Sequence, residues 1–152
     1  MTITAKQIQT AIVRKYSSDV VLSNFYYGAW ECDVFRLLST GYIIEYEVKI
    51  SRNDFFNDFE KERYKLNKHI ELMNGNESMC NRFYFVVPAN LVSVDEIPKH
   101  CGLIYYDASD SSLKVVKNAK LLHKKEVSLN YFKKLTYKLY YRLADAKLNL
   151  PK

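Results

Sequence analysis

The chain contains 152 residues, the size of one domain with a core of its own. Its apolar fraction of 48% and charged fraction of 26% are ordinary for a globular protein, and its four glycines and three prolines exclude a collagenous or low-complexity chain. The net charge of +6 is uneven: residues 1–113 hold 12 basic and 15 acidic residues, whereas residues 114–152 hold 11 basic and two acidic ones. A basic C-terminal quarter is compatible with a polyanionic partner.

Several classes of site are excluded by missing motifs. The chain holds no apolar run of about 18 residues and no apolar N-terminal stretch, so we expect neither a membrane span nor a signal peptide. It holds neither GxxxxGK[ST] nor GxGxxG, so we expect no nucleotide cofactor. The three cysteines fit no zinc motif and indicate buried or half-buried thiols in a reducing compartment. The scattered His69, His100 and His123 indicate structural or surface roles rather than a metal site.

The predicted elements begin with a helix and an extended segment. Thr4 and Gln7 match a capping box, and Ile8 and Ile12 mark one apolar face of the helix that follows. This helix is expected to end near residues 17–19. A strand or extended loop follows from residue 20 to residue 25.

A β-hairpin is predicted next, with strands over residues 30–38 and 42–50 and a glycine-containing turn at residues 39–41. If Thr40 is the centre of the turn, residues face each other when their numbers sum to about 80, which places Asp33 opposite Glu47. The even-numbered side chains of the second strand are apolar and are expected to form core. The odd-numbered face gathers four carboxylates and one lysine: Glu31, Asp33, Glu45, Glu47 and Lys49.

This charged face has two interpretations. Clustered carboxylates repel one another and raise each other's pKa, and a divalent cation such as Mg²⁺, which prefers hard oxygen ligands, relieves that conflict. The alternative is a solvated outer face with cross-strand salt bridges.

The remaining elements complete a mixed α/β pattern. A helix is expected over residues 53–73, after a cap at Ser51 or Asn53 and before the break at residues 74–76. A strand over residues 83–87 is expected to be buried on both faces, and an irregular stretch precedes strands over 103–106 and 113–116. The order predicts one domain over residues 1–152 with a mixed central β-sheet flanked by helices.

A long final helix is predicted over about residues 128–146. Its core-facing residues are expected to be Leu129, Phe132, Leu135, Leu139 and Leu143. Lys134, Lys138 and Arg142 follow one another at four-residue spacing and form a basic stripe suited to phosphates. The alternative is a solubilising face bordered by partly buried tyrosines.

One combination of residues resembles a known family. Asp33, followed on the next strand by Glu47-Val48-Lys49, is similar to the signature of the PD-(D/E)XK nuclease superfamily. The stretch over 50–58 and the segments 82–88 and 102–106 also resemble its small phage and bacterial members, including the MmcB-like DNA-repair group. The resemblance covers roughly residues 1–122.

The resemblance implies a fold and an activity. The fold would be a restriction-endonuclease-like core with the order αβββαβ, and the reaction would be hydrolysis of phosphodiester bonds in DNA, in repair, recombination or phage DNA processing. Asp33, Glu47 and the Val48 carbonyl would bind Mg²⁺, or Mn²⁺ in its place, and Lys49 would position or deprotonate the attacking water. Arg52 lies near the hairpin and is a candidate phosphate contact. We expect a cytoplasmic protein, and a homodimer would allow two strands to be cut.

Two departures from the family pattern keep a second hypothesis open. Cys32 stands where the family often has proline, and the first helix carries no acidic residue, with Gln7 and Gln9 as its nearest polar substitutes. The chain could therefore be a nucleic-acid-binding module that keeps the nuclease fold without efficient cleavage. A third hypothesis is a general interaction domain with a charged hairpin face.

Overall fold

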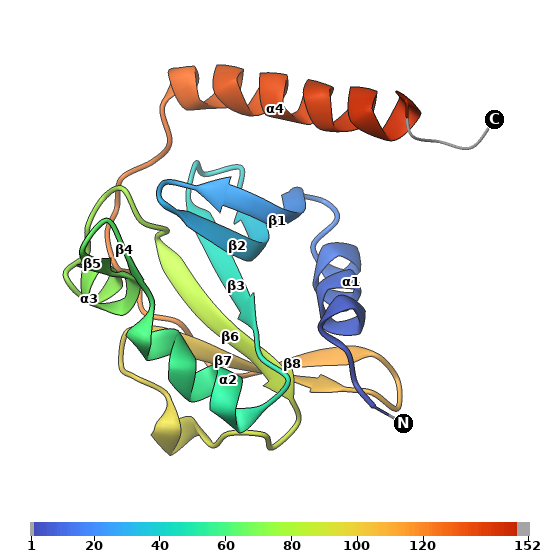
Figure 1. The fold of residues 1–152 in the computed structure, drawn as a ribbon, viewed down its shortest axis with the longest axis vertical. Coiled ribbons are helices and arrows are strands. Elements are labelled where there is room, and N and C mark those ends of the chain that lie inside the picture. Colours follow the sequence, from blue (N-terminus) through green and yellow to red (C-terminus); the bar gives the residue numbers. More distant parts are fainter. Residues whose placement is uncertain (1, 149–152) are drawn as a thin grey trace.

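The structure, a computed structural model, describes residues 2–148 and has a mixed six-stranded sheet flanked by helices (Figure 1). The expected α/β class and mixed central sheet are confirmed. The strand order is β1-β2-β3-β6-β7-β8. These strands are β1 (Val20–Tyr27), β2 (Trp30–Leu37), β3 (Ile43–Val48), β6 (Arg82–Pro88), β7 (Cys101–Asp107) and β8 (Ser112–Lys117).

The centre of the sheet is parallel and its two sides are antiparallel. Strands β3, β6 and β7 run parallel, whereas the pairs β1–β2, β2–β3 and β7–β8 are antiparallel. The predicted hairpin register is confirmed, because Val34 pairs with Tyr46 and Leu37 with Ile43. Gly41, with φ +87°, supplies the positive φ in the turn that sets this register.

Helix α1 (Ala5–Lys15) covers one face of the sheet (Figure 1). The predicted capping box is present: the Gln7 amide donates to Thr4 Oγ1 at 3.3 Å, and the Thr4 amide donates to Gln7 Oε1 at 2.8 Å. Ile8 and Ile12 are fully buried and pack with the even-numbered hairpin side chains, such as Tyr46. The expected helix and its core face are therefore confirmed.

Helices α2 (Arg52–Asn57) and α3 (Lys68–Met73) lie on the other face (Figure 1). Phe55 and Leu72 bring apolar side chains from these helices to Phe35, Ile43 and their neighbours on the sheet. The odd-numbered face of the hairpin is therefore also largely buried, and the expected core on the even-numbered face is confirmed for Ile44, Tyr46 and Val48. The solvated outer face considered as an alternative is wrong for the same reason.

The single helix expected over residues 53–73 is also wrong. The chain forms α2, a 3₁₀ turn η1 (Asp58–Glu60), a small hairpin of β4 (Glu62–Arg63) and β5 (Leu66–Asn67), and then α3. Tyr64 and Lys65 have φ values of +54° and +63°, which reverse the chain and end any helix. This path buries Lys68 and His69, whereas Ile70 and Met73 of the expected apolar stripe are exposed.

Helix α4 (Leu129–Leu148) lies at the β1 edge of the central sheet (Figure 1). The helix is confirmed, but its expected core face is largely wrong. Of the five expected core residues, Leu135 is buried and Leu139 is half-buried, whereas Leu129, Phe132 and Leu143 are 78%, 41% and 58% exposed. The helix contacts the core through the row Tyr131, Leu135 and Leu139.

No helix within residues 2–148 has both the length and the apolar character needed to cross a membrane.

Candidate metal-dependent active site

The hairpin brings the predicted signature residues into one pocket. The pocket has a volume of about 360 Å³ and opens where β2 and β3 meet α2. Acidic, basic and backbone groups line it together, and we call it the carboxylate pocket. Its main lining residues are Asp33, Glu47, Val48, Lys49, Asp54, Asp58 and Lys61.

Two of the other predicted carboxylates lie elsewhere. Glu31 is exposed near the start of β2 and does not line the pocket. Glu45 is 3% exposed and lies deeper under the sheet, where the Lys68 ammonium donates a short hydrogen bond to Glu45 Oε1. Lys68 is itself fully buried. Burial alone would lower the pKa of Lys68, but the charges of Glu45 and Glu47 outweigh it and raise that pKa.

Asp33 is held at the edge of the pocket by the backbone of the facing strand. Its Oδ2 accepts a hydrogen bond from the Val48 amide at 2.8 Å. Burial and the negative charge of Glu47 nevertheless raise the pKa of Asp33 to about 6. Among residues 2–148, Asp33 has no cationic side chain within salt-bridge distance, so its negative charge is less compensated than the charges of Glu47 and Asp58.

Two lysines bridge the other two buried carboxylates. Lys49 Nζ lies 3.0 Å from Glu47 Oε1 and 2.8 Å from Asp58 Oδ1. Lys61 Nζ lies 2.6 Å from the same Glu47 oxygen and 2.7 Å from the same Asp58 oxygen. Glu47 and Asp58 are 3% and 1% exposed, so their charges depend on these lysines for compensation.

Lys49 is therefore a cation in this arrangement. Burial alone would lower the pKa of Lys49, but Glu47 and Asp58 outweigh it and raise that pKa. The side chain can donate hydrogen bonds and present positive charge, whereas a role as the base that deprotonates water requires the loss of both carboxylate partners.

Asp58 has a second contact on its other side. Its Oδ2 lies 2.6 Å from His69 Nε2, and His69 Nδ1 lies 2.9 Å from His100 Nε2. Although burial alone would raise the pKa of Asp58, the His69 hydrogen bond and the two lysines hold that pKa well below its usual range. Burial and the neighbouring His69 lower the pKa of His100 to about 4, so this imidazole is neutral at physiological pH.

The first helix supplies no carboxylate to the pocket. The residue of α1 that lines it is Ala5. Gln9 Nε2 donates to the Asp33 carbonyl at 3.0 Å and to Asn24 Oδ1 at 3.1 Å, so this glutamine supports the backbone of Asp33. Gln7 is committed to the capping box with Thr4.

The predicted nucleic-acid contacts are distributed over two regions. Arg52 pairs with Glu96 at 2.5 Å and donates to the Leu91 carbonyl at 3.0 Å. Arg142 donates to the Ser23 and Asn24 carbonyls at 2.9 and 3.1 Å.

The two lysines of the basic stripe differ in their surroundings. Lys138 Nζ lies 4.9 Å from the centre of the Phe25 ring. Lys134, Lys138 and Arg142 are all exposed, so each member of the stripe presents charge to solvent.

The sequence prediction missed Lys61, Lys68 and the paired histidines as parts of a site, whereas Asp58 was one of four carboxylates considered as a further oxygen donor, with Glu31, Glu45 and Asp54. Asp58 and Lys61 are three residues apart in the sequence, a spacing that also fits a surface pair on a helix. A local signal was present in Asn67, a residue type favoured at helix N-caps, which caps α3 in the structure.

Comparisons with known proteins give one structural match. No family model matches the chain, and no curated protein matches it. A solved structure of a protein of unknown function from Silicibacter pomeroyi is similar, with a TM-score of 0.65 and 20% sequence identity over 96% of this chain and 90% of that chain. At this identity the match shows a shared fold alone.

Proposed function

We propose that the protein is a metal-dependent nuclease that hydrolyses phosphodiester bonds in DNA. The observation that supports this most strongly is the convergence of Asp33, Glu47 and Lys49 in one pocket from two adjacent strands. The alternative interpretation of the alternating charges, a solvated outer face, does not account for a Glu47 that is 3% exposed. Burying such charges is costly, which favours a role in a site.

The order of elements supports a restriction-endonuclease-like core as part of this proposal. Helix α1 is followed by the antiparallel strands β1, β2 and β3, then by α2 and α3, and then by β6, which pairs parallel with β3. This order corresponds to the expected αβββαβ core. The signature residues lie where β3 ends and the chain enters α2.

The oxygen ligands of the pocket suit Mg²⁺. Asp33, Glu47 and the Val48 carbonyl are hard oxygen donors, the kind that this ion prefers. Glu47 Oε2 is buried and accepts no hydrogen bond within residues 2–148, and its ion pair with Lys68 Nζ is long, at 3.6 Å, so this oxygen retains an acceptor position for a metal ion. When bound, the ion would supply positive charge to the phosphate and lower the pKa of a coordinated water.

The lysines would act through their charge and position. Lys49 is held by Asp58 and Glu47 beside the carboxylates, where its ammonium would orient water and offset negative charge that develops on the phosphate. Lys61 has the same partners but a side chain that is 36% exposed, so it can leave Glu47 and turn toward a substrate phosphate.

The test is cleavage of linear, single-stranded, nicked and branched DNA in Mg²⁺ or Mn²⁺. We expect Asp33→Ala and Lys49→Ala each to lower the cleavage rate by at least about 100-fold, because each removes a group that acts directly at the reacting phosphate. The matched control is Glu31→Ala, which removes an exposed carboxylate of the same strand outside the pocket and should retain the wild-type rate.

The second candidate function is a nucleic-acid-binding module with the same fold and no efficient cleavage. Two observations favour it: α1 faces the pocket with Ala5, and two lysines already occupy Glu47 Oε1. Salt-dependent DNA binding with no metal-dependent cleavage of any of the four substrates would reject the nuclease and support this module. The absence of both binding and cleavage would reject both candidates.

A further inference from the structure

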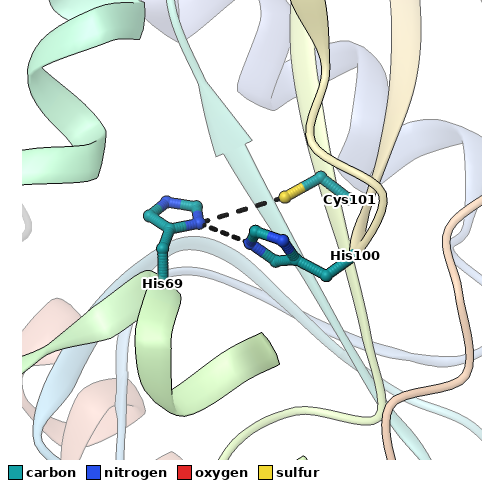
Figure 2. A group of neighbouring side chains, drawn as sticks. All are labelled: His69, His100 and Cys101. Atoms are coloured by element: carbon teal, nitrogen blue, oxygen red, sulfur yellow. Dashed lines mark hydrogen bonds between the residues drawn. The ribbon is translucent and has the colours of Figure 1, made fainter. Parts of the chain in front are cut away.

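A second polar cluster lies behind the carboxylate pocket. Its members are His69 from α3 and His100 and Cys101 from the entry to β7, and all three are buried (Figure 2). We call it the His–Cys cluster. His69 Nδ1, His100 Nε2 and Cys101 Sγ point toward one another, and these three atoms lie within 4.8 Å of one another.

We propose that the His–Cys cluster is a binding site for a divalent metal ion of the zinc class. Two imidazole nitrogens and one thiolate are the ligands that Zn²⁺ takes in three-ligand sites, with a fourth position left for water. The proposal does not depend on the nuclease function, because none of these ligands lines the carboxylate pocket.

The distances suit such an ion. His69 Nδ1 lies 2.9 Å from His100 Nε2 and 3.9 Å from Cys101 Sγ. In tetrahedral zinc sites, bonds of about 2.0 Å to nitrogen and about 2.3 Å to sulfur put ligand atoms roughly 3.3–3.7 Å apart. The two distances from His69 Nδ1 therefore reach the required spacing after shifts of a few tenths of an ångström, and the third distance, from His100 Nε2 to Cys101 Sγ, is at most 4.8 Å.

The surroundings of His69 are those of a metal ligand. Its second ring nitrogen, Nε2, lies 2.6 Å from Asp58 Oδ2, which fixes the proton on that nitrogen and leaves Nδ1 with a lone pair facing the cluster. Its ring packs against the rings of Phe59, Phe83 and Phe85 at centroid distances of 4.6, 5.3 and 5.7 Å. An apolar shell of this kind excludes competing water and holds the ring in place.

Hydrogen bonding without a metal accounts for only part of this geometry. His100 can donate to His69, and His69 can donate to Asp58, so these three side chains form one hydrogen-bond network. Cys101 has no role in that hydrogen-bond network, since its sulfur is 3.9 Å from His69 Nδ1. A metal ion uses all three inward-facing atoms, and this favours the metal site.

The direct test is titration of the metal-free, reduced protein with Co²⁺ in the absence of oxygen. We expect one sulfur-ligated ion per chain, with the intense visible bands of tetrahedral cobalt and a near-ultraviolet charge-transfer band from sulfur, both removed by Zn²⁺. Cobalt bound at the carboxylate pocket would have oxygen ligands alone and give no sulfur band, so Asp33→Asn should leave the spectrum unchanged. Loss of nuclease activity therefore cannot be mistaken for loss of this site.

Variants identify the ligands. Cys101→Ala should abolish the sulfur band, whereas Cys80→Ala, which removes another fully buried thiol, should retain it. Asp58→Asn should keep the band and weaken Co²⁺ binding by roughly 10–100-fold, as expected when the partner of a ligating histidine is altered. If Cys101→Ala does not fold, X-ray absorption of the zinc-loaded wild type should show one sulfur and two imidazole ligands.

Two results would overturn the proposal. One is a folded, reduced wild-type protein that shows no sulfur-to-cobalt band at saturating Co²⁺. The other is a band that persists in folded Cys101→Ala and disappears in Cys80→Ala. Either result would leave the hydrogen-bonded chain from His100 to Asp58 as the role of the histidines.

Discussion

Asp58 connects the two polar clusters through the two oxygens of a single carboxylate. Its Oδ1 contacts Lys49 and Lys61, and its Oδ2 contacts His69. Any change in charge at His69 therefore acts on the group that positions Lys49. Because Asp58 is 1% exposed, water cannot screen this connection.

Asp33 provides a prediction at the residue scale. The pKa of Asp33 is raised to about 6 in the metal-free fold from an ordinary value of 3.8. Between pH 3.8 and about 6, the Asp33 carboxyl is largely deprotonated in the unfolded chain and largely protonated in the folded protein. The contribution of Asp33 to stability therefore falls as pH rises from about 4 to about 6, by up to about 3 kcal/mol, and then stays constant.

Substitution isolates this contribution. Asp33→Asn should match the wild type in stability near pH 3.5 and exceed it near pH 7, measured by urea unfolding in the presence of a chelator. The asparagine can still accept the Val48 amide hydrogen bond. Asp54→Asn, which removes an exposed carboxylate of the same pocket, serves as the control. A stability difference between wild type and Asp33→Asn that does not vary with pH would contradict the prediction.

At the scale of elements, local patterns predicted the strands well. The hairpin register could be read from the sequence because Gly41 fixes the turn and the alternation of side chains then fixes every pair. The helix over residues 53–73 could not be read in this way. Its apolar spacing is helical, but burial of Lys68 against Glu45 and the reversal at Tyr64-Lys65 depend on tertiary contacts.

The same distinction applies to the candidate site. Asp33, Glu47 and Lys49 were found because a hairpin places them by local geometry. Asp58 and Lys61 reach the site through the 3₁₀ turn that ends α2, and His69 reaches it only after the chain has reversed. Helical periodicity also did not identify the docked face of α4. Helix α4 carries more apolar side chains than its contacts with β1 and the neighbouring segments bury. Periodicity alone therefore could not distinguish the buried row of residues from the exposed apolar residues.

Helix α4 provides a prediction at this scale. Leu135 is 4% exposed in the row that contacts the core, whereas Leu143 is 58% exposed. Leu135→Ala should lower the free energy of unfolding by about 2–4 kcal/mol through loss of burial and the cavity left behind. Leu143→Ala should change it by less than about 0.5 kcal/mol. Equal effects in chemical denaturation would show that α4 does not dock through the Tyr131–Leu135–Leu139 row.

Across the whole molecule, the basic and acidic groups are separated. The carboxylate pocket lies in the part of the chain with more acidic than basic residues, and α4 belongs to the basic part on the β1 side of the sheet (Figure 1). The contacts of Arg142 with the Ser23 and Asn24 carbonyls tie this basic part to β1. A polyanion bound along α4 would therefore be held at a fixed position relative to the hairpin.

This separation predicts different effects from different cations of α4. Lys134→Gln removes an exposed charge, so it should weaken DNA binding and lower the slope of log affinity against log salt by roughly one, with stability unchanged. Arg142→Gln should reduce both DNA affinity and stability, because its guanidinium also holds two carbonyls of β1.

The control for this prediction is Lys99→Gln, which removes an exposed lysine outside the basic segment and should leave the slope unchanged. Fluorescence anisotropy over a range of salt concentrations measures the slope. The same slope for wild type and Lys134→Gln would remove α4 from the DNA-binding surface.

The parallel pairing of β3 with β6 has a consequence for the folding of the chain. These neighbouring strands are separated in sequence by residues 49–81, and that segment carries Lys49, Asp58, Lys61 and Lys68. The chain must close this long loop before the central pair forms, a non-local step that tends to make folding slow. Lys49 and Lys61 contact Glu47 from the segment that directly follows β3, whereas Lys68 reaches Glu45 only when most of the loop has folded back, so the deepest ion pair forms together with loop closure.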